Sequence, residues 1–208
     1  MAEQLDFRQL SIADFLTQAA SSEPVPGGGS ISAVAGALAA SMGQMVLNLT
    51  IGKEKYKQFE ADCISHLHSL QKAQSILLQL MDEDIAAFAE FSAARKLDKN
   101  DPGRAPAMAQ AIEACIAVPL EICAVGLAIL ESLDKVKEKS NIYLLSDLGV
   151  GAVLAAAIVK SAAYNVKANL SMVKDDQQVK TLRSQMEHDA KRAHEMLASI
   201  ENFLATKL

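Results

Sequence analysis

The chain has 208 residues, of which 50% are hydrophobic, 22% are charged and 4% are aromatic, and its formal net charge is −5. This length fits one domain or two small ones, and so large an apolar fraction excludes a disordered chain. The negative charge argues against general binding to nucleic acid or to anionic membranes. The three cysteines form no C-x-x-C pair and the N-terminus carries no apolar signal region, so we expect a reduced, cytoplasmic protein.

Six helical patterns follow one another along the chain, at about 11–21, 30–50, 55–96, 104–138, 141–172 and 177–206. Short polar or Gly- and Pro-rich segments separate them, and no run alternates with the period of a strand. The sequence therefore predicts one all-α domain over residues 1–208, a bundle of about six helices. Gly and Ala line one side of the second and fifth patterns, so we expect these two helices at the centre and a further apolar face buried in a homodimer.

One uncharged stretch, residues 31–51, is long enough to span a bilayer. Polar side chains, among them Ser41, Gln44 and Asn48, interrupt this stretch, and its large apolar side chains recur every three or four residues. We interpret it as a helix buried in a soluble bundle rather than as a membrane span.

The third helical pattern carries a candidate acid. Asp84 falls inside its apolar stripe, close to Met81 and Phe88, whereas Asp82 and Glu83 point away from the stripe. Because desolvation disfavours the ionised form, a carboxyl group in such a place can hold a proton and deliver it as a general acid. An Asp in a salt bridge at a helix interface fits the spacing equally well.

The fifth helical pattern places three polar side chains on an otherwise small and apolar face. Asp147 shares this face with Asn165 and Asn169, while Lys160 and Lys167 point elsewhere. One carboxylate and two amides can hydrogen-bond the edge of a heterocyclic ligand. A buried polar network that fixes the helix register explains the same spacing.

Three consecutive glycines, Gly27, Gly28 and Gly29, precede the second helical pattern and are followed by Ser30 as the expected N-cap. Free N–H groups at the positive end of a helix dipole form a ready anion site. The spacing matches neither a P-loop nor a dinucleotide-binding turn, so a nucleotide ligand is not indicated.

A basic cluster follows the same helix at its far end, where Lys53, Lys55 and Lys57 surround Tyr56. These lysines can bind a carboxylate. A solvated, basic start of the next helix accounts for them as well.

The histidines do not suggest a metal site. His66 and His68 are two residues apart and cannot share a helix face. No zinc-protease, serine-hydrolase or Cys–His motif is present, so we expect neither a metal centre nor a covalent nucleophile.

Several segments together resemble the formiminotransferase-cyclodeaminase C-terminal family. They are PVPGGGSISAVAGALAASMGQMVLNLTIGKEKY, EDIAAF, AVPLEIC and SDLGVGAVLAAAIVKSAAYNVKANL, and they follow in order over nearly the whole chain. The resemblance implies an all-helical, dimeric, cytosolic enzyme that acts on a tetrahydrofolate derivative, with no metal and no tightly bound cofactor.

The resemblance also assigns site residues. It places the family's essential acid at Asp84, its glycine loop at Gly27, Gly28 and Gly29, its Lys-x-Lys-Tyr element at Lys53, Lys55 and Tyr56, its Ser-Asp element at Ser146 and Asp147, and its paired asparagines at Asn165 and Asn169. Two positions depart from the family pattern. Asp98 stands where a Pro is usual and Ala168 where a larger aliphatic residue is usual, and both affect loop or pocket shape more than chemistry.

The implied reaction is the closure of 5-formiminotetrahydrofolate to 5,10-methenyltetrahydrofolate with loss of ammonia. Asp84 would move the protons, while Asp147, Asn165 and Asn169 would orient the pterin. The glycine loop with Lys53 or Lys55 would hold the carboxylates of the folate tail. A methenyltetrahydrofolate cyclohydrolase would use the same residues, and a non-catalytic helical interaction module is the rival from another class.

Overall fold

A computed structural model of the protein describes residues 6–208, and within this range every regular element is a helix. The α-helices are α1 (Ile12–Ala19), α2 (Gly28–Asn48), α3 (Glu60–Lys96), α4 (Arg104–Val136), α5 (Leu145–Asn169) and α6 (Asp176–Ala205). Three short 3₁₀ segments, η1 (Glu54–Phe59), η2 (Ile142–Leu144) and η3 (Leu170–Met172), lie at helix junctions. The all-α fold predicted from the periodicity is confirmed.

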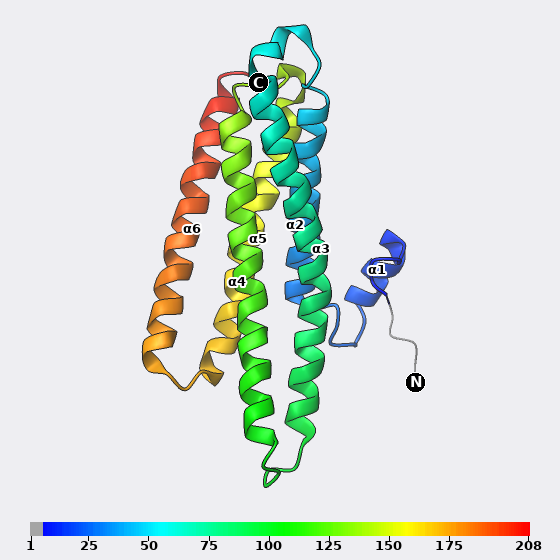
Figure 1. The fold of residues 1–208 in the computed structure, drawn as a ribbon, viewed down its shortest axis with the longest axis vertical. Coiled ribbons are helices and arrows are strands. Elements are labelled where there is room, and N and C mark those ends of the chain that lie inside the picture. The colour runs from blue at the N-terminus through cyan, green and yellow to red at the C-terminus, as the bar shows by residue number, and fades with distance from the viewer. Residues whose placement is uncertain (1–5) are drawn as a thin grey trace.

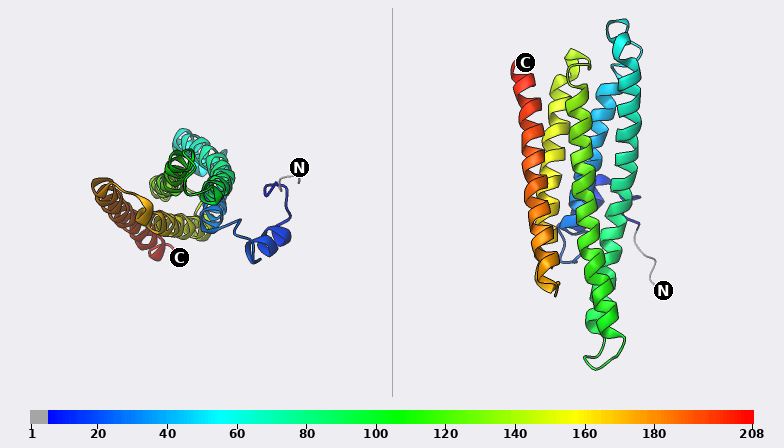
Figure 2. Two further views of the ribbon diagram at one scale, coloured as in Figure 1. Left: turned by 90° about the horizontal axis from the view of Figure 1, so that it is seen from below. Right: turned by 60° about the vertical axis from the view of Figure 1, so that its left-hand side comes forward.

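The five long helices run up and down side by side, and α1 stands apart beside the lower half of the bundle (Figure 1). Helix α2 packs against α3 and α5, and α4 packs against the same two helices. Helix α6 covers α4 and α5, as the end-on view shows (Figure 2). This arrangement leaves α2 and α5 adjacent over most of their length.

Glycines allow the closest helix contacts. A Cβ at Gly36 of α2 would lie 2.6 Å from Ile158 Cδ1 of α5, and a Cβ at Gly151 would lie 3.2 Å from the carbonyl oxygen of Ala39. Since protein interiors are close-packed, a side chain at either position would force the two helices apart. The two small-residue-rich helices therefore lie in close contact.

Both α2 and α5 also have an outer side, which we call the α2–α5 face. Its exposed apolar side chains are Ile31, Leu38, Leu49, Val150, Val153 and Tyr164. Leu38 is 55% exposed and Tyr164 is 63% exposed, values far from those of core residues.

Three helical segments are long and apolar enough to cross a membrane, judged by length and composition alone. They are Gly28–Asn48, Arg104–Val136 and Ile142–Met172. Each is only partly covered within the bundle: 56% of the most apolar window is buried in the first segment and 39% in the last. The segment interpreted above as a buried helix is thus buried on one side only.

Candidate functional site

The candidate site forms where α3 passes the first turn of α2. The backbone N–H of Ser30 donates to Asp84 Oδ2 at 2.8 Å, and the Ser30 hydroxyl donates to the same oxygen at 2.7 Å. Hydrogen bonds to an ionised acceptor are stronger than neutral ones, and a helix N-terminus attracts negative charge. The half-buried Asp84 carboxylate is therefore held firmly in one orientation.

This contact corrects the expected role of Ser30. The N-cap of α2 is Gly27, and Ser30 lies in the first helical turn with its hydroxyl turned towards α3. From the sequence we expected an external anion at this helix N-terminus. The structure places the carboxylate of Asp84 there, 54 positions further along the chain. The glycine segment is thus not an empty anion site, because the protein's own carboxylate occupies its positive end.

The glycines make room for side chains from two other helices. A Cβ at Gly29 would overlap Asp84 Oδ1, and a Cβ at Gly28 would lie 2.8 Å from Asn165 Oδ1. Real Cβ atoms do not approach oxygen so closely, so a larger residue would displace these functional groups. The run of three glycines indicated that something approaches the backbone closely here. The sequence did not show that the approaching groups are Asp84 and Asn165.

A cavity of about 280 Å³ opens beside these groups. Its lining is Pro24, Val25, Gly27, Gly28, Gly29, Asp84, Phe88, Phe91, Cys115, Asn165, Ala168 and Asn169. Asp84 Oδ1, the carboxylate oxygen that does not accept from Ser30, lies against Gly29 on this lining. The cavity therefore combines one carboxylate, two amides and two aromatic rings, which suits a small polar heterocycle.

Cys115 is a cavity residue that the sequence did not single out. Its thiol lies 3.6 Å from the carbonyl oxygen of Ala87. Burial, followed by the negative charge of Asp84, raises the pKa of the Cys115 thiol above its usual value. The group is thus a protonated, weakly nucleophilic thiol at neutral pH.

The two asparagines are fixed by hydrogen bonds to the backbone. Asn169 Nδ2 donates to the carbonyl oxygen of Cys115 at 2.9 Å and to that of Asn165 at 3.1 Å. Asn165 Nδ2 donates to the carbonyl oxygen of Ser161 at 3.3 Å. Since these bonds use both amide hydrogens of Asn169, its side-chain oxygen is the atom that remains to bind a ligand.

The other predicted site residues form a second group at the opposite end of the bundle. Lys53 and Lys55 follow the last turn of α2, which at 21 residues places them about 30 Å from the cavity. Asp147 and Ser146 start α5, and Asp147 is separated from Asn165 by about 27 Å of helix. Asp147, Asn165 and Asn169 lie on one helix, as predicted. Asp147 is too far along the axis, however, to contact the same ligand as the two asparagines within a single chain.

Hydrogen bonds fix this second group. The buried Tyr56 hydroxyl accepts from the backbone N–H of Ile142 at 3.0 Å, which ties η1 to the segment before α5. Lys55 Nζ lies 5.5 Å from the centre of the Tyr56 ring. Lys53 and Lys55 are exposed, and neither forms an ion pair within residues 6–208. In one chain, therefore, the glycine segment and these lysines cannot hold the same carboxylate.

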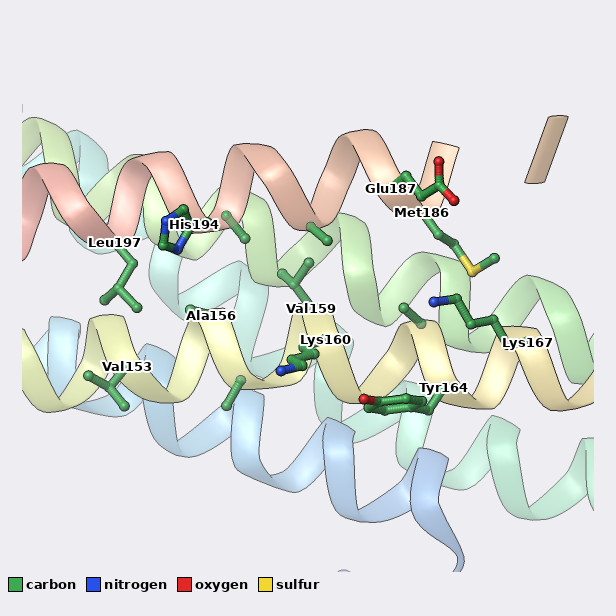
Figure 3. A pocket seen from close by; sticks show the side chains of 14 residues that line it. Val153, Ala156, Val159, Lys160, Tyr164, Lys167, Met186, Glu187, His194 and Leu197 are labelled. Atoms are coloured by element: carbon green, nitrogen blue, oxygen red, sulfur yellow. The ribbon is translucent and has the colours of Figure 1, made fainter. Parts of the chain in front are cut away.

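A larger groove of about 530 Å³ lies between α5 and α6. Figure 3 shows Lys160 and Lys167 on α5 and Glu187 and His194 on α6 among its lining side chains. None of the candidate site residues predicted from the sequence lines this groove, and it contains no asparagine or glutamine side chain. In the described part of the chain, no group of three His, Cys, Asp or Glu side chains is placed to hold a metal ion.

Comparison with known proteins gives one consistent result. The formiminotransferase-cyclodeaminase family profile matches residues 11–188. A methenyltetrahydrofolate cyclohydrolase from Methylorubrum extorquens is 37% identical over 169 residues, which cover 79% of this chain and 81% of the relative. A formimidoyltransferase-cyclodeaminase from Gallus gallus is 33% identical over 77% of this chain, but the match covers only 30% of that longer protein.

A solved structure is similar over the entire fold. The crystal structure of formiminotetrahydrofolate cyclodeaminase from Thermotoga maritima superposes with a TM-score of 0.89 at 25% identity. The match covers 97% of this chain and 98% of that one. The helical arrangement that forms the Asp84 cavity is thus shared with a chain of similar extent.

Proposed function

The chain belongs to the formiminotransferase-cyclodeaminase family, and from this membership we propose that it acts on a tetrahydrofolate derivative at the one-carbon unit carried by N5 and N10. The observation that carries the proposal is the Asp84 carboxylate, held by Ser30 in a cavity lined by amides and aromatic rings. In its first form the proposal is cyclodeamination, the activity for which the similar structure from Thermotoga maritima is named.

In cyclodeamination, the substrate supplies its own nucleophile. The N10 amine of 5-formiminotetrahydrofolate attacks the formimino carbon on N5, and N10 loses its proton as the ring closes. The formimino group enters as a protonated amidine, –CH=NH2+, so the proton that N10 loses gives its nitrogen a third hydrogen. The bond between this nitrogen and the tetrahedral carbon then breaks, and ammonia and the methenyl cation are formed. The enzyme then needs to orient the substrate and to carry protons between the two nitrogens, and it needs no covalent nucleophile.

Asp84 is the group that we assign to this proton transfer. Its Oδ2 accepts both hydrogen bonds from Ser30, which leaves Oδ1 to take the proton from N10 and to return it to the departing nitrogen. The oxygens of Asn165 and Asn169 would accept hydrogen bonds from the pterin edge. Phe88 and Phe91 would pack against its apolar atoms.

Methenyltetrahydrofolate cyclohydrolase activity is the second candidate. The observation that favours it is the 37% identity to the relative of that name over about four fifths of both chains. Here water attacks the methenyl carbon and loses a proton to Asp84. The bond from this carbon to N5 then breaks, N5 takes up that proton, and the hydroxyl group loses its proton as it becomes the formyl carbonyl of 10-formyltetrahydrofolate. The same carboxylate serves both reactions because each passes through a tetrahedral carbon between two nitrogens.

Two substrates and one chromophore distinguish the candidates. A cyclodeaminase supplied with 5-formiminotetrahydrofolate produces the methenyl absorbance and ammonia, whereas a cyclohydrolase supplied with 5,10-methenyltetrahydrofolate removes that absorbance. Conversion of neither substrate, with no folate binding by calorimetry, would favour the non-catalytic interaction module.

Substitution of the acid tests its role. For Asp84→Asn we expect kcat to fall by about 10²–10⁴-fold, the usual contribution of a positioned acid–base group. Asp82→Asn is the matched control, because Asp82 lies on the same helix but pairs with Arg8 at the surface. Full turnover by Asp84→Asn would contradict the assignment.

We also propose a cytoplasmic location for the protein. Cys63, Cys115 and Cys123 are all free thiols, as suits a reducing compartment. Cell fractionation with an antibody against the protein tests this, and recovery in the membrane fraction would contradict it.

A further inference from the structure

Helix α4 contains a proline, Pro119, near its middle, and the site described above gives this residue no role. Proline is the least favourable residue in a helix interior. It has no N–H to donate, and its ring collides with the carbonyl group four residues earlier. Pro119 is nevertheless buried, and α4 continues across it as one helix from Arg104 to Val136.

The carbonyl group four residues before Pro119 is that of Cys115. In a regular helix this carbonyl would accept a hydrogen bond from the N–H of residue 119, which a proline does not have. Cys115 lines the Asp84 cavity, so the carbonyl without a helical donor belongs to a residue in the wall of the site. A backbone acceptor that is removed from water in this way requires a donor from another element.

Asn169 of α5 supplies that donor. Its Nδ2 donates to the carbonyl oxygen of Cys115 at 2.9 Å and to that of Asn165 at 3.1 Å. An asparagine amide can turn over about its last bond, which exchanges its nitrogen and its oxygen. The two carbonyl oxygens decide between these orientations, because an amide oxygen turned towards them would be repelled. The oxygen Oδ1 of Asn169 is therefore the free acceptor, on a residue that lines the cavity.

The two acceptors of the Asn169 amide differ in origin. The carbonyl of Asn165 belongs to the same helix as Asn169, four residues earlier, and its presence does not depend on α4. The carbonyl of Cys115 ties the amide to α4 and makes the shorter of the two bonds. It has no helical donor to share with Asn169 because residue 119 is a proline.

We propose that Pro119 is a positioning residue: it leaves the Cys115 carbonyl free to orient the Asn169 amide, so that Asn169 Oδ1 accepts a hydrogen bond from an N–H group of the pterin ring. The inference rests on the proposed function for the identity of the ligand, whereas the contacts from Pro119 to Asn169 do not depend on it. Pro119 does not itself line the cavity, so it acts on the ligand through Asn169.

A double-mutant cycle separates this role from a purely structural one. Pro119→Ala restores the N–H that competes with Asn169 for the Cys115 carbonyl. We expect it to raise KM for the folate that the enzyme converts by about 3–10-fold, the value of one hydrogen bond, and to leave kcat within about twofold. The Kd of 5-formyltetrahydrofolate, a stable folate with the same pterin ring, should rise equally in calorimetry.

The second arm of the cycle removes the Asn169 side chain. Asn169→Ala should raise KM and Kd at least as much as Pro119→Ala does, because the acceptor itself is lost. Adding Pro119→Ala to Asn169→Ala should then change neither constant further, since the proline has no amide left to orient. If Pro119 only shapes α4, its substitution has the same effect with and without the Asn169 side chain, and that result would overturn the proposal.

Pro106→Ala is the matched control. Pro106 lies in the first turn of the same helix, where N–H groups have no helical acceptor, so its replacement should leave KM and Kd at their wild-type values. Because Pro119 is buried, Pro119→Val is a second variant that restores the N–H and fills more of the space left by the ring. Failure of both Pro119 variants to fold would show that the proline serves the fold, and it would overturn the proposal.

The side-chain amide signals of Asn169 test the contact without any folate. The chain has six asparagines, so selective ¹⁵N labelling gives a simple magnetic resonance spectrum, and Asn169→Ala identifies the signals of this residue. Both Nδ2 hydrogens are bonded to carbonyl oxygens in the wild type, so their signals should lie downfield and exchange slowly with water. In Pro119→Ala one signal should shift upfield and exchange faster, whereas Pro106→Ala should leave both unchanged.

The two kinds of measurement fail in different ways. Unchanged Asn169 signals in Pro119→Ala would overturn the proposal, whatever the enzyme converts. If the signals change as expected but the wild type binds no folate, the proposed function fails, while the orientation of Asn169 by Pro119 holds.

Discussion

The substitution Gly29→Ala gives the sharpest test of how the carboxylate is held. The added Cβ would overlap Asp84 Oδ1, so the carboxylate has to move away from Ser30. Two hydrogen bonds to a charged group are worth about 1.5–3 kcal/mol each, or about 3–6 kcal/mol together. Ala is about 1 kcal/mol better than Gly in a helix. The free energy of unfolding should therefore fall by about 2–5 kcal/mol.

The activity should fall further than the stability suggests. Because proton transfer requires the carboxylate at hydrogen-bonding distance from the reacting nitrogen, we expect kcat to drop by about 10²–10⁴-fold at a temperature where the variant is folded. Urea denaturation and the methenyl absorbance measure the two effects. Gly103→Ala is the control, since its Cβ would lie 3.2 Å from Asp101 Oδ1 in an exposed loop. Near-normal kcat and stability in Gly29→Ala would refute the reasoning.

Three further substitutions probe separate features. Ser30→Ala removes one donor to Asp84 but keeps the N–H, so kcat should fall about tenfold, the equivalent of about 1.4 kcal/mol. Gly36→Ala places a Cβ 2.6 Å from Ile158 Cδ1 and should lower the free energy of unfolding by about 1–3 kcal/mol without changing kcat of the folded enzyme. Burial, with repulsion from Lys135 and Lys139, lowers the pKa of His66 below 6.5, so the fold favours the neutral ring. Its contribution to stability is complete above that pH and is lost as the pH falls, and thermal melts should show this loss in the wild type but not in His66→Gln.

The helices could be predicted because their periodicity is a local property of the sequence. The second pattern was expected at about 30–50 and is observed as Gly28–Asn48. The third was expected from about 55, but residues 54–59 form a 3₁₀ segment before α3 begins at Glu60. The buried Tyr56 of this 3₁₀ segment accepts a hydrogen bond from the backbone N–H of Ile142, 86 positions away. Such a tertiary contact cannot be predicted from the local sequence pattern.

The sequence predicted which side of its own helix each site residue faces, but not which residues of other helices it contacts. The position of Asp84 inside an apolar stripe follows from a turn of 100° per residue, and the structure places this residue in a cavity. The function of Ser30 was misjudged because capping rules consider only neighbours in sequence, whereas its hydroxyl bonds to α3. Asp147 and Asn165 point to the same side of the helix because 18 residues make five full turns. They still lie about 27 Å apart along the helix axis, and a view down the axis does not show this distance.

The two oxygens of the Asp84 carboxylate have different surroundings. Oδ2 accepts both hydrogen bonds from Ser30, whereas Oδ1 lies against Gly29 on the cavity lining. One oxygen therefore fixes the position of the group, and the other is left for the two proton transfers that the proposed reaction requires. Among the described residues, no Lys or Arg lines this cavity, so no cation competes with a substrate nitrogen for Oδ1.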